Sequence, residues 1–88
     1  MEACTLITLP TVLRVGPYRF FFYSADQDEP PHVHVERESF EAKFWLKPVQ
    51  LERGGGFGGA EVRRIGKLVT ENETQLLSGW HEYFGNPI

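Results

Sequence analysis

The sequence predicts an α+β domain in which an antiparallel sheet of four to five strands is followed by two C-terminal helices packed on one face. Apolar and polar residues alternate with a period of two in the first half of the chain, which is typical of half-buried strands. Apolar residues in the second half recur at intervals of three and four, which is typical of amphipathic helices. Because all the strands precede the helices, this order favours helices gathered on one face of an antiparallel sheet.

The length of 88 residues allows one domain, residues 1–88, and leaves no room for a second. A chain of this size buries about 64% of its unfolded surface, which is enough for a single modest core. Hydrophobic residues make up 41% of the chain and aromatic residues 14%. This composition indicates a folded globule and not a disordered segment.

Strand character dominates the first half, over residues 10–53. We expect strands at residues 10–15, 18–23, 32–36 and 40–46, with a short edge strand at 49–51. Residues 24–31 are acidic and end in two prolines, so we expect a loop there that cannot continue a ladder. Residues 1–9 are expected to form a frayed N-terminus.

Two apolar stripes at helical spacing indicate two helices within residues 59–84. The first stripe consists of Val62, Ile65, Leu68 and Val69. The second stripe consists of Leu76, Leu77, Trp80 and Phe84. Gly85 and Pro87 are expected to end the second helix. The residues expected to form one core under these helices are Phe20, Phe22, Val35, Phe44, Ile65, Leu77 and Trp80.

The glycine-rich stretch at residues 54–59 precedes the first helix and could form an anion-binding turn. It lacks the Gly-Lys-Ser/Thr ending of a nucleotide-binding P-loop. We therefore interpret it as a flexible connector.

The net charge of −3 argues against an indiscriminate nucleic-acid binder. Residues 1–41 hold seven acidic and three basic residues, whereas residues 42–88 hold five acidic and six basic residues. No apolar run is long enough for a membrane span, and the first residues lack the features of a signal peptide. The one cysteine, Cys4, excludes an internal disulfide. We expect a cytoplasmic protein that makes no membrane contact.

Alternation sorts the strand residues onto two faces of the sheet. The apolar face is expected to consist of Val33, Val35, Phe40, Ala42, Phe44 and Leu46. The opposite face is expected to consist of His32, His34, Glu36, Glu41, Lys43 and Trp45. We assign Arg19 and Tyr23 to this second face, because an arginine beneath two helices would need a buried partner. The prediction is an open, polar sheet surface that carries two histidines.

His32 and His34 are two residues apart on a strand, so both imidazoles point to one side at a Cα separation of about 6.5–7 Å. This spacing suits an acid–base pair that straddles a phosphate. It also suits two-point zinc chelation. A third interpretation is that both side chains are exposed and have no chemical role. The residues themselves leave these three alternatives open.

Several segments together resemble a small bacterial family, the domain of unknown function 4160 (DUF4160). The resemblance rests on residues 10–14, 18–24, 30–35, 42–46, 62–65 and 80–84. The run Pro-Pro-His-Val-His-Val at residues 30–35, combined with the aromatic strand before it, is its most specific part. The glycine-rich stretch at residues 54–59 departs from the family pattern, where a shorter turn is expected.

The resemblance implies that the chain is the toxin of a type II toxin–antitoxin pair, with a small antitoxin encoded nearby as its partner, and that His32 and His34 match the family's histidines. We expect a metal-independent ribonuclease without a cofactor, in which one histidine takes the 2′-hydroxyl proton and the other protonates the leaving oxygen. Arg19 and Lys43 would neutralise the phosphate. The residues assigned to substrate binding are Tyr23, Trp45, Glu36 and Glu41.

Two alternatives to this function belong to other classes. The chain could be a non-enzymatic module whose polar sheet binds and occludes a protein target. It could also be a metal-dependent hydrolase in which His32 and His34, with Glu36 or Glu41, are the ligands.

Overall fold

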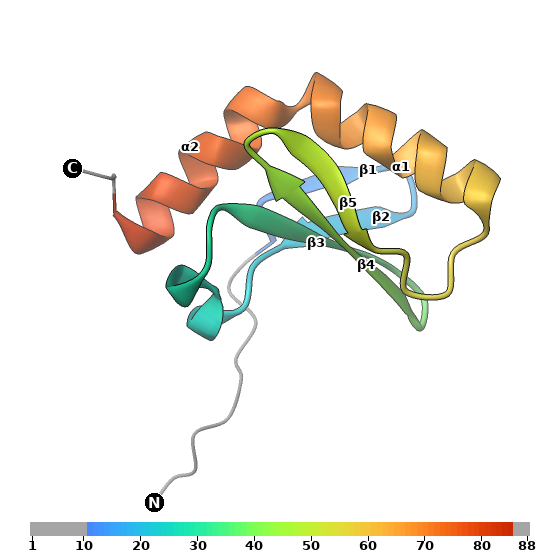
Figure 1. Cartoon of the computed structure of the whole chain (residues 1–88), viewed down its shortest axis with the longest axis horizontal. Coiled ribbons are helices and arrows are strands. Elements are labelled where there is room, and N and C mark those ends of the chain that lie inside the picture. The colour runs from blue at the N-terminus through green and yellow to red at the C-terminus, as the bar shows by residue number, and fades with distance from the viewer. Residues whose placement is uncertain (1–10, 86–88) are drawn as a thin grey trace, which may run out of the picture.

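A computed structural model describes residues 11–85 and has the predicted architecture (Figure 1). The elements in chain order are β1 (Leu13–Val15), β2 (Tyr18–Phe21), the 3₁₀ helix η1 (Ser24–Asp28), β3 (His32–Arg37), β4 (Phe40–Leu46), β5 (Val49–Arg53), α1 (Gly59–Glu71) and α2 (Glu73–Phe84). The expectation for residues 1–9 lies outside the described residues. Within residues 11–85, no helix is long and apolar enough to cross a membrane.

The five strands form one antiparallel sheet in the order β1-β2-β3-β4-β5, so each strand pairs with its neighbours in sequence. Both helices lie on the same face of this sheet (Figure 1). Strands β3 and β4 form a hairpin, with His32 opposite Trp45 and His34 opposite Lys43. The two faces of β3 and β4 are therefore those expected from the alternation.

Strand boundaries differ from the predictions in β1, β2, β3 and β5. Strand β1 begins at Leu13, and β3 extends to Arg37. The second strand ends at Phe21 instead of residue 23, because the chain turns at Tyr23 into η1. The last strand extends to Arg53. The segment expected to be an irregular loop, residues 24–31, begins with the short helix η1.

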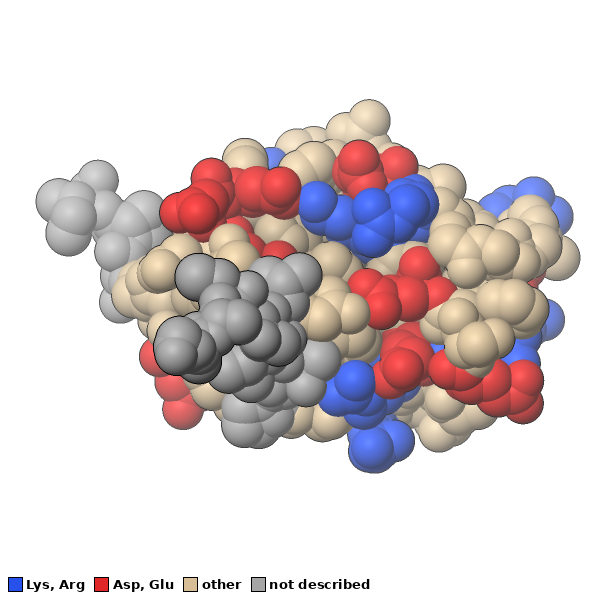
Figure 2. Space-filling view, turned by 90° about the horizontal axis from the view of Figure 1, so that it is seen from below, with Lys and Arg blue, Asp and Glu red and all other residues tan. Residues whose placement is uncertain are grey.

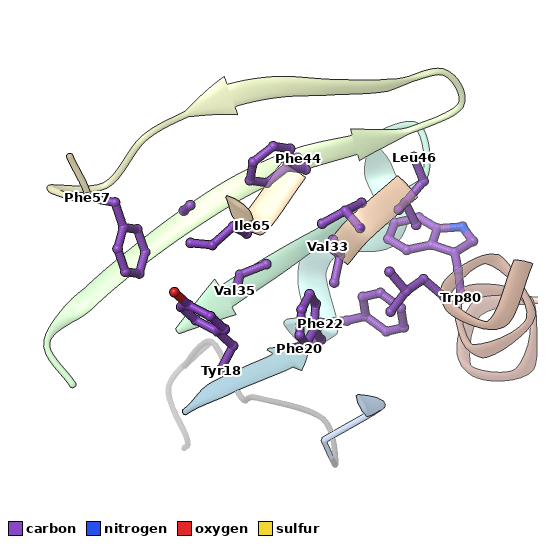
Figure 3. Packing of buried hydrophobic residues seen from close by; sticks show 13 residues of the cluster. Tyr18, Phe20, Phe22, Val33, Val35, Phe44, Leu46, Phe57, Ile65 and Trp80 are labelled. Carbon is purple, nitrogen blue, oxygen red and sulfur yellow. The ribbon is translucent and has the colours of Figure 1, made fainter. Parts of the chain in front are cut away.

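One hydrophobic core lies between the sheet and the two helices (Figure 3). At one end the ring of Phe22 packs against Trp80 of α2, with ring centroids 5.4 Å apart. At the opposite end Tyr18 packs against Phe57, with centroids 6.4 Å apart. The predicted core is confirmed except at Leu77, which is only partly buried. Leu76 is fully buried in its place, because α2 approaches the sheet through Gly79, where an added Cβ would lie 2.7 Å from Val12.

The glycine-rich segment is a packed turn, and our interpretation of it as a flexible connector is wrong. Gly55 has a φ of +63°, and a Cβ there would lie 1.7 Å from the carbonyl oxygen of Glu41. Only glycine allows this close approach of the turn to β4. Phe57, two residues after Gly55, is buried in the core.

A partly buried ion pair joins the first turn of α1 to the sheet. Arg37 Nε and one of its terminal nitrogens donate to the Glu61 carboxylate at 2.8 and 2.9 Å. The Tyr18 hydroxyl donates to the same carboxylate at 2.7 Å. Hydrogen bonds from Arg37 and then from Tyr18 hold the pKa of Glu61 below its usual value. Three donors from two strands therefore fix the start of the helix.

Candidate metal centre

The two histidines of β3 are buried, so the expectation of an open histidine surface is wrong. His32 is 0% exposed and His34 is 4% exposed. The side chains do lie on the face opposite Val33 and Val35, as predicted, but residues 24–31 fold over that face. A substitution of either histidine therefore acts on a buried position, and we do not expect it to be neutral for stability.

Aromatic rings enclose both imidazoles. His34 stacks on Phe21 with centroids 5.5 Å apart, and the ring of Tyr23 meets its face at 4.6 Å. His32 lies between Trp45 and Trp80, at 5.6 and 5.1 Å. These walls exclude water and hold the two imidazole rings 5.1 Å apart.

Asp26 of η1 brings one carboxylate onto both histidines. Its Oδ1 lies 3.0 Å from Nε2 of His32, and its Oδ2 lies 3.1 Å from Nε2 of His34. The short helix places it there because the Asp26 backbone N–H donates to the Tyr23 carbonyl, while the Tyr23 N–H donates back to Oδ2 at 2.8 Å. Burial opposes ionisation of Asp26, but the contacts with both histidines and the Tyr23 N–H outweigh it and hold the pKa of Asp26 well below its usual range.

The other nitrogen of each imidazole faces an oxygen acceptor. Nδ1 of His32 lies 2.9 Å from the carbonyl oxygen of Pro30. Nδ1 of His34 lies 3.2 Å from Oε2 of Glu41. A carbonyl oxygen only accepts, so His32 carries a proton on Nδ1. In the neutral ring its Nε2 lone pair faces the Asp26 carboxylate, and a proton or a cation on Nε2 would remove this repulsion. Both nitrogens of His34 face carboxylates, Asp26 at Nε2 and Glu41 at Nδ1, so these contacts do not select one tautomer.

Nε2 of His32 and Nδ1 of His34 are buried and lack a hydrogen-bond partner of good geometry, although Asp26 Oδ1 and Glu41 Oε2 lie close to them. A buried polar nitrogen without a hydrogen bond lowers the stability of the fold unless another group or ion binds it. Ligand atoms of Asp26, His32 and His34 all lie within 4.8 Å of one another. Two imidazoles and one carboxylate form a common ligand set for zinc and other divalent transition metals, and three protein ligands leave a position for water or substrate.

The outer contacts also fit a metal site. Histidine ligands almost always donate their second N–H to a carbonyl or a carboxylate, which fixes the ring and the tautomer. Pro30 and Glu41 provide one of each. Glu41 is in turn held by the Tyr23 hydroxyl at 2.8 Å. Burial, and then the hydrogen bond to Glu41, raise the pKa of Tyr23 to about 12.

Two cations that we expected to contact phosphate are already paired with carboxylates. Arg19 Nε donates to Glu36 at 2.8 Å, and its guanidinium lies 4.0 Å above the Phe21 ring. Lys43 Nζ lies 2.7 Å from Glu29 Oε1, and the hydrogen bond from Lys43 lowers the pKa of Glu29. Glu36 is occupied by Arg19 and not by a histidine.

Trp45, expected to stack on a base, is partly buried between His32 and Lys43, whose Nζ lies 4.8 Å from its ring. Acidic and basic side chains alternate over the face of the molecule opposite the helices (Figure 2). Around the histidines themselves, the carboxylates of Asp26, Glu29 and Glu41 all lie within 4 Å of an imidazole nitrogen. The negative charge of these carboxylates attracts a cation to the histidines and repels a phosphate.

The sequence did not identify Asp26 as part of the site. The nearest signal was the acidic loop before His32, but nothing in that loop distinguishes Asp26 from Asp28 or Glu29. By contrast, the alternation of β3 and β4 was sufficient to place His32, His34 and Glu41 on one face.

No curated protein and no solved structure matches the chain with significance. The family described as "Domain of unknown function (DUF4160)" matches residues 18–81. That range covers most of the 88 residues and includes Asp26, both histidines and Glu41. The chain therefore belongs to the DUF4160 family.

Proposed function

We propose that this chain is a metal-dependent hydrolase that acts on RNA as the toxin of a type II toxin–antitoxin pair. The observation that supports the hydrolase is the convergence of two imidazole Nε2 atoms on the Asp26 carboxylate, with Nδ1 of His32 bonded to the Pro30 carbonyl and Nδ1 of His34 3.2 Å from Glu41. A divalent metal bound there supplies Lewis acidity and lowers the pKa of a bound water.

The protein residues have separate roles in this proposal. Asp26, His32 and His34 hold the metal. The Pro30 carbonyl keeps the proton of His32 on Nδ1, Glu41 faces Nδ1 of His34, and Tyr23 orients Glu41. The aromatic walls exclude water, which strengthens each electrostatic contact inside the site.

A metal-independent acid–base pair, which we expected from the sequence, has less support. Both imidazoles are buried, and a general base must reach the proton that it abstracts. The neighbouring carboxylates also disfavour a bare phosphodiester in contact with the rings. A bound divalent cation would reverse the sign of this local field.

The toxin role rests on the family resemblance, and the edge strand β5 supports a protein partner. All but the first residue of β5 are exposed, including Leu51 at 44%. An exposed sheet edge with an apolar side chain can accept a strand from another protein. We therefore propose that a small cognate antitoxin pairs with this edge.

The test compares wild type with Asp26→Asn and with the matched control Asp28→Asn, which changes an exposed neighbour in η1. Growth inhibition on induction, degradation of total RNA and bound metal are measured for each protein. We expect the wild type and Asp28→Asn to bind one zinc ion and degrade RNA, and Asp26→Asn to lose both properties.

Chelator provides the second arm of this test. RNA degradation that persists in chelator-treated, metal-free protein would restore the acid–base mechanism. Growth inhibition by a folded Asp26→Asn protein would contradict the metal-dependent hydrolase and favour occlusion of a protein target.

A further inference from the structure

A cavity of about 370 Å³ lies beside the histidines, between the segment that covers them and the end of α2. Gln27 and Pro31 form one wall, and Trp80, His81 and Phe84 form the other. The volume falls within the range of about 300–1,000 Å³ that is typical of small-molecule sites.

The cavity lies next to the candidate metal centre and shares Trp80 with it. Trp80 lines the cavity and also lies 5.1 Å from the His32 ring. Gln27 follows Asp26 directly in η1, and Pro31 precedes His32. A molecule in the cavity would therefore contact Trp80 beside His32 and the immediate chain neighbours of Asp26 and His32.

The cavity combines an aromatic surface with a cationic rim. The rings of Trp80 and Phe84 lie 4.5 Å apart at an angle of 59°. Lys47 lines the cavity, is exposed, and forms no ion pair with any residue in the range 11–85. His81 adds a second nitrogen base, with Nδ1 turned toward the Gly85 carbonyl at 3.4 Å, which leaves Nε2 on the other side of the ring.

We propose that this cavity binds a single nucleotide, as the substrate subsite of the hydrolase. Trp80 is only 5% exposed and packs against Phe84, so the partly exposed ring of Phe84 is the surface on which a planar base would stack. Base–aromatic stacking is tolerant of base identity. The amide of Gln27 offers both a donor and an acceptor to a base edge. Lys47 and His81 complement the phosphate. The proposal rests on the proposed function for the reaction, but the binding of a nucleotide does not depend on it.

The lysine distinguishes this subsite from the rest of the sheet surface. Lys43 and Arg19, on the same side of the sheet as the histidines, are already neutralised by Glu29 and Glu36. Lys47 lines the cavity and forms no ion pair with a carboxylate of residues 11–85. A ligand that combines an anionic group with a planar ring can therefore contact both Lys47 and the aromatic surface in this cavity.

The test titrates the intact, metal-free chain with adenosine, guanosine, cytidine and uridine monophosphates by calorimetry. The indole N–H signals of the two tryptophans are followed by NMR. The variants are Lys47→Gln and Phe84→Leu, and the matched control is Lys67→Gln, an exposed lysine of α1 that does not line the cavity.

We expect all four nucleotides to bind, with a shift of the Trp80 signal that exceeds that of Trp45. Lys47→Gln and Phe84→Leu should each weaken binding by about tenfold, the size expected for the loss of one base-stacking or phosphate contact. Lys67→Gln should bind as the wild type does.

Three results would overturn the subsite: equal affinity for inorganic phosphate and for the nucleotides, wild-type affinity in Phe84→Leu, or tighter binding of a phosphotyrosine peptide than of any nucleotide. Because the titration uses metal-free protein, failure of the metal site leaves these readings unchanged. Conversely, a chain that binds zinc but no nucleotide would overturn the subsite alone.

Discussion

The Oδ2 atom of Asp26 lies 3.1 Å from Nε2 of His34, which joins a loop helix to the middle of a strand eight residues further along the chain. This contact, together with the 3.0 Å contact to His32, converts a sheet surface into an enclosed cluster of ligands. The position of Asp26 determines both the burial of the histidines and the chemistry available to them.

Zinc should stabilise the folded chain if Asp26, His32 and His34 bind it. A ligand at a hundredfold excess over its Kd adds about 2.7 kcal/mol to the free energy of unfolding. We expect a rise in the melting temperature of the wild type on addition of zinc, reversed by chelator. His34→Gln should melt at the same temperature with and without zinc, and a zinc-dependent rise in that variant would count against His34 as a ligand.

Glu41 should act on the metal through His34. Outer carboxylates of this kind typically change metal affinity by about 10–100-fold. We expect Glu41→Gln to weaken zinc binding by that factor while retaining one site per chain, as measured by competition with a chromogenic chelator. Glu36→Gln is the matched control, because Glu36 lies on the same face but pairs with Arg19. Equal losses in the two variants would point to a general effect of charge.

Phe44 should contribute strongly to stability. It is 3% exposed, and its ring meets the α1 backbone at Gly66, where an added Cβ would lie 3.3 Å from Cε2. Truncation to Ala should lower the free energy of unfolding by about 3–5 kcal/mol. Leu51→Ala, at an exposed position of β5, should change it by no more than about 0.5 kcal/mol. Chemical denaturation measures both, and a change of less than 1 kcal/mol in Phe44→Ala would contradict the core packing.

Acid should release the start of α1 from the sheet. The pKa of Glu61 is lowered in the folded state from its ordinary value of 4.5, by Arg37 and then Tyr18. A lowered folded pKa contributes stability above the unfolded pKa, and this contribution is lost as the pH falls through the folded pKa. We expect Glu61→Gln to melt at a lower temperature than the wild type at pH 7, with the difference shrinking below pH 4.5. A difference that is independent of pH would show that the carboxylate charge is not responsible.

The strand pattern was sufficient to predict the two strands β3 and β4 and which of their residues share a face. Side chains of a strand alternate in direction, and a short turn between residues 36 and 40 leaves little freedom in register. The helices were predictable for a similar reason, because a stripe of apolar residues at helical spacing has to face a core. Leu77 shows the limit of this reasoning, since Leu76 and Leu77 both lie near the stripe and only the approach of α2 at Gly79 decides between them.

The sequence by itself determined that His32, His34 and Glu41 share one face of a sheet, because the two-residue period of a strand is a local property. Only the tertiary structure decided that this face is covered and that Asp26 completes the cluster. The conformation of residues 24–31 depends on contacts with residues distant in sequence, namely Trp80 of α2 beside His32 and Lys43 of β4 beside Glu29. An acidic loop has no periodicity from which the direction of one carboxylate can be derived, so its role emerges only when the strands, the loop and α2 are packed together.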